Sequence, residues 1–241
     1  MPKRTLPAFV PARTRRWHHP NERDENRLAY AIAESVFSYA ARTYASGTLL
    51  DIGCGTKPLA PIFAPYVTEH VGVDHADATH GLAAVEIVAT AYEIPLADDF
   101  ADTVLMSAVL EHLERPADAL TECHRLLRPG GHIILTAPFI WPVHEAPRDF
   151  YRYSPYGLRH LLETAGFEVV EVQPYAGAWT TFALEISNAL RTHRHGVATP
   201  FVAISTRLLQ AFLAWLDRAD YQPRFSWSHV AIGRTSAVAG G

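Results

Sequence analysis

Ionisable and aromatic side chains are concentrated between Pro138 and Pro155, where the chain reads PFIWPVHEAPRDFYRYSP. Histidine has an ordinary pKa close to neutral, so His144 is a candidate general base for removing a proton from a hydroxyl group. Glu145 and Asp149 are the acids that would orient its ring. The alternative is a hydrogen-bonded loop network, including Arg152, that only shapes a pocket. The segment therefore predicts acid–base chemistry, with His144, Glu145 and Asp149 as the catalytic residues.

The same residues do not predict a metal site. The chain contains 13 histidines, among them the adjacent His18 and His19, so a histidine close to an acid is expected by chance. No known zinc-binding spacing is present around His144. The two cysteines, Cys54 and Cys123, are too few for a disulfide framework or a thiolate metal site. We therefore expect no bound metal.

A second candidate site is the loop DIGCGT at residues 51–56, which follows a short apolar run. Its glycines allow the backbone to approach a ligand closely. The dinucleotide fingerprint requires a glycine or alanine where Pro58 stands, which disfavours a nicotinamide or flavin cofactor. Asp74, at the end of the next apolar run, can accept hydrogen bonds from both hydroxyls of a ribose. The pattern predicts a nucleoside-containing cofactor, and a nicotinamide-dependent oxidoreductase or a non-catalytic binding module of the same fold are the alternatives.

Short apolar runs alternate with amphipathic patterns along the chain, as in a sheet built from βαβ units. The sequence predicts an α/β fold, a Rossmann-like sheet of seven mostly parallel strands with helices on both faces. Ligands of such sheets bind at the carboxyl ends of the strands, where both candidate segments lie. Strands are predicted at residues 48–53, 71–74, 85–88, 103–106, 132–136, 167–172 and 227–233. Helices are predicted at residues 26–46, 59–66, 108–113, 117–127 and 155–166, with two more around Pro200.

The 241 residues are expected to form a single domain over residues 26–236, preceded by an arm at residues 1–25. Residues 1–20 carry five lysines and arginines and no acid, interrupted by prolines, which predicts a flexible basic arm. The expected parts of the domain are an N-terminal helix (26–46), a cofactor-binding core (47–173), a helical insertion (176–224) and the last strand (225–236).

The insertion at residues 176–224 is strongly apolar at helical spacing. A helical pair packed on the sheet or a homodimer interface would explain this pattern. A lid over a large acceptor would also explain it, together with Trp17 of the arm. We expect the helices to close one side of an acceptor pocket.

Composition excludes several classes of protein. With 49% hydrophobic and 19% charged residues, the chain can build a sizeable core and is neither disordered nor collagen-like. No apolar run approaches the roughly 18 residues that cross a bilayer, and no signal-peptide core is present, so we expect a cytoplasmic protein without a membrane span. The net charge of −4 and the small basic arm do not predict a nucleic-acid partner.

Four segments, in order, resemble the class I S-adenosylmethionine-dependent methyltransferases over most of residues 47–173. These segments are LLDIGCGT (49–56), VGVD (71–74), EIPL with FAD and VLEHL (93–113), and LLRPGG (126–131). The loop that contains HEAPRDFYRY (144–153) resembles a type 11-like subgroup associated with glycan and natural-product biosynthesis. The Asn/Asp-Pro-Pro-Tyr/Phe signature of many N-methyltransferases of nucleic-acid bases and protein amides is absent at Ser107–Leu110, which disfavours methylation of DNA.

The resemblance implies S-adenosylmethionine as the cofactor. Gly53 and Gly55 would cradle its methionine part, Asp51 would orient its amino group, and Asp74 would hold its ribose. Thr90 stands where an acid usually contacts adenine, so the neighbouring backbone is expected to replace that contact. The cofactor-binding residues that the resemblance implies are Asp51, Gly53, Cys54, Gly55, Asp74, His75, Ala91, Tyr92, Ser107 and His112.

The activity that the resemblance implies is methyl transfer to a small-molecule or glycan-precursor acceptor, most readily at oxygen. Glu111 and His112 are also open to a purely structural reading, as caps of a helix. Cys54 is expected to fill space in its loop, because no base near it in the sequence would activate its thiol. The residues expected to bind the acceptor are Tyr151, Arg152, Tyr153, Trp141 and Trp17.

Overall fold

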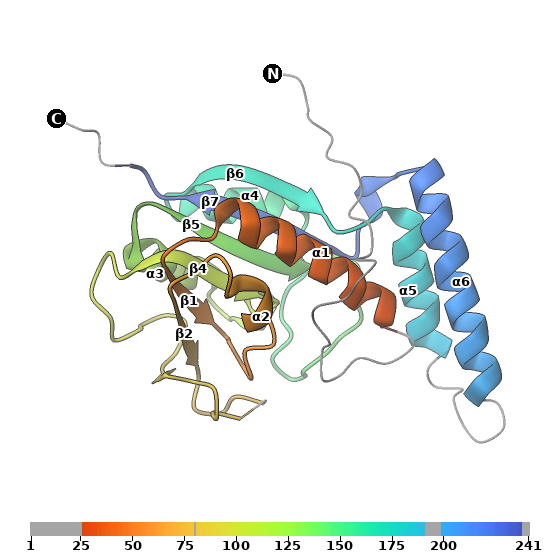
Figure 1. The fold of residues 1–241 in the computed structure, drawn as a ribbon, viewed down its shortest axis with the longest axis horizontal. Coiled ribbons are helices and arrows are strands. Elements are labelled where there is room, and N and C mark those ends of the chain that lie inside the picture. The colour runs from red at the N-terminus through yellow and green to blue at the C-terminus, as the bar shows by residue number, and fades with distance from the viewer. Residues whose placement is uncertain (1–25, 80, 191–198, 238–241) are drawn as a thin grey trace.

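A seven-stranded sheet forms the centre of the molecule, a computed structural model that describes residues 26–79, 81–190 and 199–237 (Figure 1). The order across the sheet is β3-β2-β1-β4-β5-β7-β6, and β7 runs antiparallel to both of its neighbours. The strands are β1 (Thr48–Ile52), β2 (Glu69–Asp74), β3 (Ile87–Val88), β4 (Ala101–Ser107), β5 (Leu127–Pro138), β6 (Glu168–Pro174) and β7 (Ser228–Arg234). This sheet confirms the predicted Rossmann-like α/β class.

Helices cover both faces of the sheet, because side chains of successive strand residues point to opposite sides. On one face Leu49, Leu105 and Ile134 pack with the α1 residues. On the other, Leu50 and Val104 pack with residues of α3 and α4. The α-helices are α1 (Arg27–Tyr44), α2 (Ala60–Phe63), α3 (Pro116–Leu126), α4 (Pro155–Thr164), α5 (Ala178–Leu190) and α6 (Thr199–Ala219). Two short 3-10 helices are η1 (Leu110–His112) and η4 (Pro223–Phe225).

The direction in which strands are added changes between β1 and β4, which is where doubly wound sheets bind ligands. From β1 the chain builds outward through β2 to β3, and it then returns to place β4 on the other side of β1. Ile52 pairs with Met106 in the parallel register. The glycine loop after β1 and the segment after β4 therefore leave the sheet side by side.

Helix starts agree with the sequence pattern better than helix lengths do. Ser154 accepts a hydrogen bond from the Gly157 N–H (3.1 Å), and Pro155 occupies the first position of α4, as predicted. The helix predicted at residues 108–113 is wrong in length, since only η1 forms. Ala108 has a φ of +54°, in the left-handed region, and this turns the chain before a helix can begin. Pro200 lies in the first turn of α6, so the two helices predicted around it are confirmed.

The insertion forms a pair of helices, α5 and α6, which lie side by side at one end of the sheet (Figure 1). None of the helices in the described parts of the chain is both long and apolar enough to cross a bilayer. The basic arm at residues 1–25, and with it Trp17, lies outside the described residues.

Candidate active site

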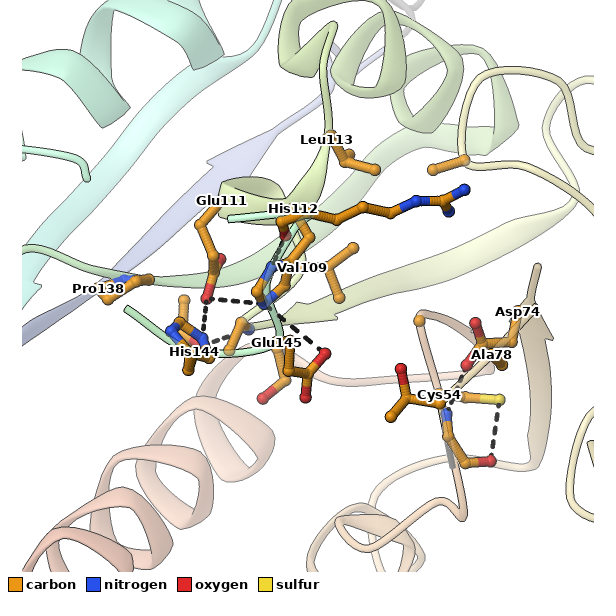
Figure 2. Close-up of a pocket in the computed structure, with 18 of the residues that line it drawn as sticks. Cys54, Asp74, Ala78, Val109, Glu111, His112, Leu113, Pro138, His144 and Glu145 are labelled. Carbon is orange, nitrogen blue, oxygen red and sulfur yellow. Dashed lines mark hydrogen bonds and ion pairs between the residues drawn. The ribbon is translucent and has the colours of Figure 1, made fainter. Parts of the chain in front are cut away.

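A cavity of about 980 Å³ opens at the carboxyl ends of the strands. Its walls come from the glycine loop after β1, the ends of β2 and β4, helix α1 and the loop that follows β5. Both segments that the sequence singled out therefore face one space. Figure 2 shows Cys54, Asp74 and Ala78 on one side of this cavity and Glu111, His112, His144 and Glu145 on the other.

Gly53, the first glycine of the loop, has a backbone conformation and surroundings that only glycine permits. Gly53 has a φ of +71°, and a Cβ atom there would lie 2.4 Å from a methyl carbon of Val109. The Gly55 N–H donates to Oδ2 of Asp74 (2.9 Å), while Oδ1 accepts from the His75 N–H (2.8 Å). Asp74 thus fixes the loop from the neighbouring strand, and each of its oxygens keeps a lone pair for a ligand.

Asp51 and Cys54 also line the cavity, but both are buried. Oδ2 of Asp51 lies 3.0 Å from Nε2 of His70, and burial raises the pKa of the carboxyl in spite of that partner. Burial raises the pKa of the Cys54 thiol to about 12, so this cysteine stays protonated near neutral pH. A protonated, buried thiol is consistent with a space-filling role in the loop.

The third predicted cofactor segment follows β3. Thr90, Ala91 and Tyr92 all line the cavity, as do His75 and Ser107. The Arg115 guanidinium lies over the Tyr92 ring, 4.5 Å from its centre, which holds the ring at the edge of the cavity. All ten residues that the resemblance implies for the cofactor line this cavity, and their roles stay predictions.

Four ionisable side chains gather at the other side of the cavity, and we call Glu111, His112, His144 and Glu145 the carboxylate–imidazole cluster. Oε1 of Glu111 lies 3.6 Å from Nε2 of His144 and 3.8 Å from Nε2 of His112. Nε2 of His112 lies 4.0 Å from Oε2 of Glu145. The Glu111 side chain is 0% exposed, and among the described residues neither of its carboxylate oxygens has a hydrogen-bond partner. The close approach of the Glu111 carboxylate to the His144 ring raises the pKa of His144, although partial burial of the ring opposes the shift.

Backbone carbonyls face Nδ1 of both rings in the cluster, and Oδ2 of Asp149 also lies 3.6 Å from Nδ1 of His144. Nδ1 of His112 is held by the carbonyl oxygen of Arg148, and Nδ1 of His144 lies 3.3 Å from that of Pro142. A carbonyl oxygen only accepts, so in the neutral rings we assign the hydrogen to Nδ1 and the lone pair to Nε2. Both lone pairs then face Glu111.

Asp149 supports this arrangement from behind the cavity. Its side chain is 2% exposed, and both of its oxygens bind the Arg152 guanidinium (2.6 and 2.7 Å). It also accepts from the His144 N–H (2.9 Å), and Arg152 donates to the carbonyl oxygen of Trp141 (3.1 Å). The guanidinium holds the pKa of the Asp149 carboxyl well below its usual range. Asp149 and Arg152 therefore fix the loop that carries His144.

Tyr151 and Tyr153 tie the same loop to η1 rather than lining the cavity. The Tyr153 hydroxyl donates to the Leu110 carbonyl (3.0 Å), and the Tyr151 hydroxyl donates to that of Glu114 (3.2 Å). Asp149 and Arg152 are likewise outside the lining, whereas Trp141, His144 and Glu145 belong to it. Acceptor binding by Tyr151, Arg152 and Tyr153 stays a prediction. Their positions outside the cavity lining do not favour it.

Several parts of the wall were not assigned from the sequence, among them helix α1 and Glu111. Helix α1 contributes Tyr30 and Phe37, where we expected the insertion to close the acceptor side. That expectation is wrong for the described residues, since none of those between 176 and 224 lines the cavity. Glu111 was not among the predicted site residues, because the sequence left a functional role and a structural role as a helix cap equally open. Its position in VLEHL beside the end of a buried strand was the available signal, but its proximity to His144 depends on the fold.

Known proteins resemble this chain in sequence and in fold. A family model described as a methyltransferase domain matches residues 50–135. A probable S-adenosylmethionine-dependent methyltransferase of Mycolicibacterium smegmatis is 32% identical over 180 residues, covering 70% of this chain and 69% of that protein. A ubiquinone biosynthesis O-methyltransferase of Pseudomonas paraeruginosa is 28% identical over 163 residues, covering 61% and 68%. The crystal structure of the cyclase SpnF aligns with a TM-score of 0.61 at 18% identity, covering 92% of this chain and 86% of that one, which is a likeness of fold alone.

Proposed function

The chain belongs to the S-adenosylmethionine-dependent methyltransferases, and on that premise we propose that it methylates a hydroxyl group of a small molecule or glycan precursor in a biosynthetic pathway. S-adenosylmethionine is the cofactor of the family, and the cavity has features that fit it. Gly53 lets the loop backbone form the cavity wall in a left-handed conformation, with Val109 packed where a Cβ would lie, and Asp74 keeps an acceptor on each oxygen for a ribose. A nicotinamide-dependent oxidoreductase is correspondingly disfavoured.

The observation that carries the proposal is the carboxylate–imidazole cluster in the same cavity as the glycine loop. The bound cofactor supplies an electrophilic methyl group on a sulfonium sulfur. In such a transfer the acceptor oxygen would form its new bond to that carbon as the sulfur–carbon bond breaks, and Nε2 of His144 would take the hydroxyl proton. Glu111, 3.6 Å away, stabilises the imidazolium that results.

Positioning of the acceptor supplies a second part of the proposed acceleration of methyl transfer. Methyl transfer is an in-line displacement, which is fast only when the acceptor is held along the axis of the breaking bond. The Asp149–Arg152 pair fixes the loop that carries Trp141 and His144, and the Trp141 ring packs against Trp227 with centres 5.3 Å apart. A rigid aromatic wall beside the proposed base favours a planar or ring-shaped acceptor.

The O-methyltransferase named among the relatives is compatible with oxygen as the methylated atom. The test is a panel of matched acceptors, each hydroxyl compound paired with its amine analogue, incubated with 13C-methyl-labelled cofactor. The proposal expects a labelled O-methyl product, detected by mass and by the 13C signal of the methyl group. Methylation of the amines alone would refute it.

The cytoplasmic location, the absence of a nucleic-acid partner and a homodimer through the insertion stay predictions. The insertion offers apolar side chains for such a dimer, since Phe201, Leu208 and Trp215 are exposed by 72%, 67% and 58%. Sedimentation equilibrium, repeated with Leu208→Glu, tests the dimer directly.

A further inference from the structure

The carboxylate of Glu111 is buried without a hydrogen-bond partner among the described residues, and its nearest cationic candidates are the two imidazoles at 3.6 and 3.8 Å. Its side chain is 0% exposed. A bare carboxylate in the protein interior is strongly unfavourable, so it must bind a proton or another cation. The surroundings of Glu111 indicate which cation fits.

We propose that Glu111, His112 and His144 bind a divalent transition-metal ion at the acceptor side of the cavity. One ligand atom from each residue lies within 4.8 Å of the other two. Oε1 of Glu111 is 3.6 Å from one imidazole Nε2 and 3.8 Å from the other. Metal–ligand bonds of 2.0–2.2 Å in a tetrahedral site place neighbouring ligand atoms about 3.4 Å apart. The Glu111 pairs are close to this separation, and the pair of ligand atoms that lies farthest apart would move inward by up to about 1.4 Å to form a coordination site.

These separations fit a shared metal ion better than direct hydrogen bonds. An imidazolium that donates to a carboxylate normally approaches to about 2.8 Å, which is closer than either Nε2 lies to Glu111. The two ring centres are only 4.8 Å apart, so two imidazolium charges would repel each other. A single dication between the three groups removes both difficulties.

The rings are also prepared on their far sides. A metal-binding histidine usually donates its other N–H to a carbonyl or carboxylate, which fixes the ring and the tautomer. Nδ1 of His112 faces the Arg148 carbonyl, and Nδ1 of His144 faces the Pro142 carbonyl at 3.3 Å. Both Nε2 lone pairs are therefore directed to Glu111 before any ion binds.

The donor set selects the class of ion. Two imidazole nitrogens and one carboxylate suit Zn²⁺, Fe²⁺, Co²⁺ or Mn²⁺, whereas Mg²⁺ and Ca²⁺ prefer oxygen ligands. Three protein ligands leave at least one position open to the cavity. A metal site could not be predicted from the spacing of these residues in the sequence, since Glu111 and His144 become neighbours only in the fold.

The use of this ion in catalysis rests on the proposed function, although its binding does not. In the metal-free protein His144 takes the proton from the acceptor hydroxyl. With the ion bound, Nε2 of His144 is a ligand, and the ion lowers the pKa of a coordinated hydroxyl so that its proton leaves to solvent. The same oxygen–carbon bond forms and the same sulfur–carbon bond breaks, without any oxidation or reduction.

The experiment is a titration of the tag-free, chelator-treated full chain with Co²⁺, followed by its visible absorption. We expect one Co²⁺ per chain at the site, displaced by Zn²⁺ and not by millimolar Mg²⁺. Glu111→Gln should weaken binding at least 100-fold, and His144→Gln should weaken it similarly. His160→Gln, which removes an exposed histidine on α4, is the matched control and should change affinity less than twofold.

Titration of the same samples with S-adenosylhomocysteine by calorimetry shows whether each variant is folded. No Co²⁺ absorption in the wild type, or binding that both cluster variants retain, would overturn the inference. If S-adenosylhomocysteine binds and a hydroxyl acceptor is methylated without cation binding, the metal site fails and the proposed function stands. If Co²⁺ binds in a Glu111-dependent way but no hydroxyl acceptor is methylated, the metal site stands and the proposed function fails.

Discussion

Replacing Asp74 with alanine should separate the cofactor half of the cavity from the acceptor half. The two carboxylate oxygens already accept one backbone N–H each, from Gly55 and His75. Each oxygen retains a lone pair, so two ribose hydroxyls can each donate one bond to an ionised acceptor. A hydrogen bond to a charged group contributes about 1.5–3 kcal/mol. The loss of two such bonds amounts to about 3–6 kcal/mol, or an affinity about 10²–10⁴-fold weaker.

The assay is calorimetric titration with S-adenosylhomocysteine, which avoids the need for a known acceptor. Asp77→Ala is the matched control, because Asp77 lines the same cavity two positions after His75 but is exposed. Its removal changes the local charge by the same amount and should alter the affinity less than fivefold. Circular dichroism melting checks that the Asp74 variant keeps its fold. Equal affinities for the wild type and a folded Asp74→Ala would refute the ribose assignment.

Two further predictions concern the loop and the core. Arg152→Lys removes the bidentate pair with Asp149, so urea unfolding should show a loss of about 1–3 kcal/mol, and S-adenosylhomocysteine affinity should stay within threefold. A stability equal to that of the wild type would contradict the bracing role of the pair. Burial lowers the pKa of His229 to about 4 in the folded chain, whereas in the unfolded chain it stays near 6.5. As the pH falls from about 6.5 to 4, the unfolded chain therefore binds a proton that the folded chain does not, and the free energy of unfolding decreases. His229→Leu should therefore gain about 2–3 kcal/mol relative to the wild type between pH 7.5 and 4.5 in urea titrations. A constant difference would show that His229 is not buried neutral.

The sheet could be predicted from the sequence because strands buried on both faces appear as short, continuous apolar runs. Leu49 and Leu50 belong to one such run, yet they pack on opposite faces. The glycine loop could be predicted as well, because its position after a strand is a local feature. The shortened helix after β4 could not be predicted. Ala108 has a left-handed backbone conformation, and its N–H donates a hydrogen bond to Thr136, which is distant in the sequence.

The acceptor side of the cavity was less predictable because it depends on contacts between distant segments. Glu111 and His144 become neighbours only when β4 and β5 pair and the Phe150 N–H donates to the Glu111 carbonyl (2.9 Å). The sequence pattern predicted Glu145 or Asp149 as the partner of His144 and did not indicate Glu111, whose Oε1 lies 3.6 Å from Nε2 of His144. Likewise, the amphipathic pattern of α1 predicted a buried face without indicating that Tyr30 would line the cavity.

We propose separate tasks for the two halves of the cavity: the side with Asp74 binds the cofactor, and the carboxylate–imidazole cluster acts on the acceptor. The most direct measurement is the turnover of His144→Gln with a hydroxyl acceptor, together with its affinity for S-adenosylhomocysteine. A general base or metal ligand at His144 predicts a kcat lower by about 10²-fold or more, with the affinity within threefold of wild type. An unchanged kcat, or an affinity that falls in step with the kcat, would contradict the division of the site.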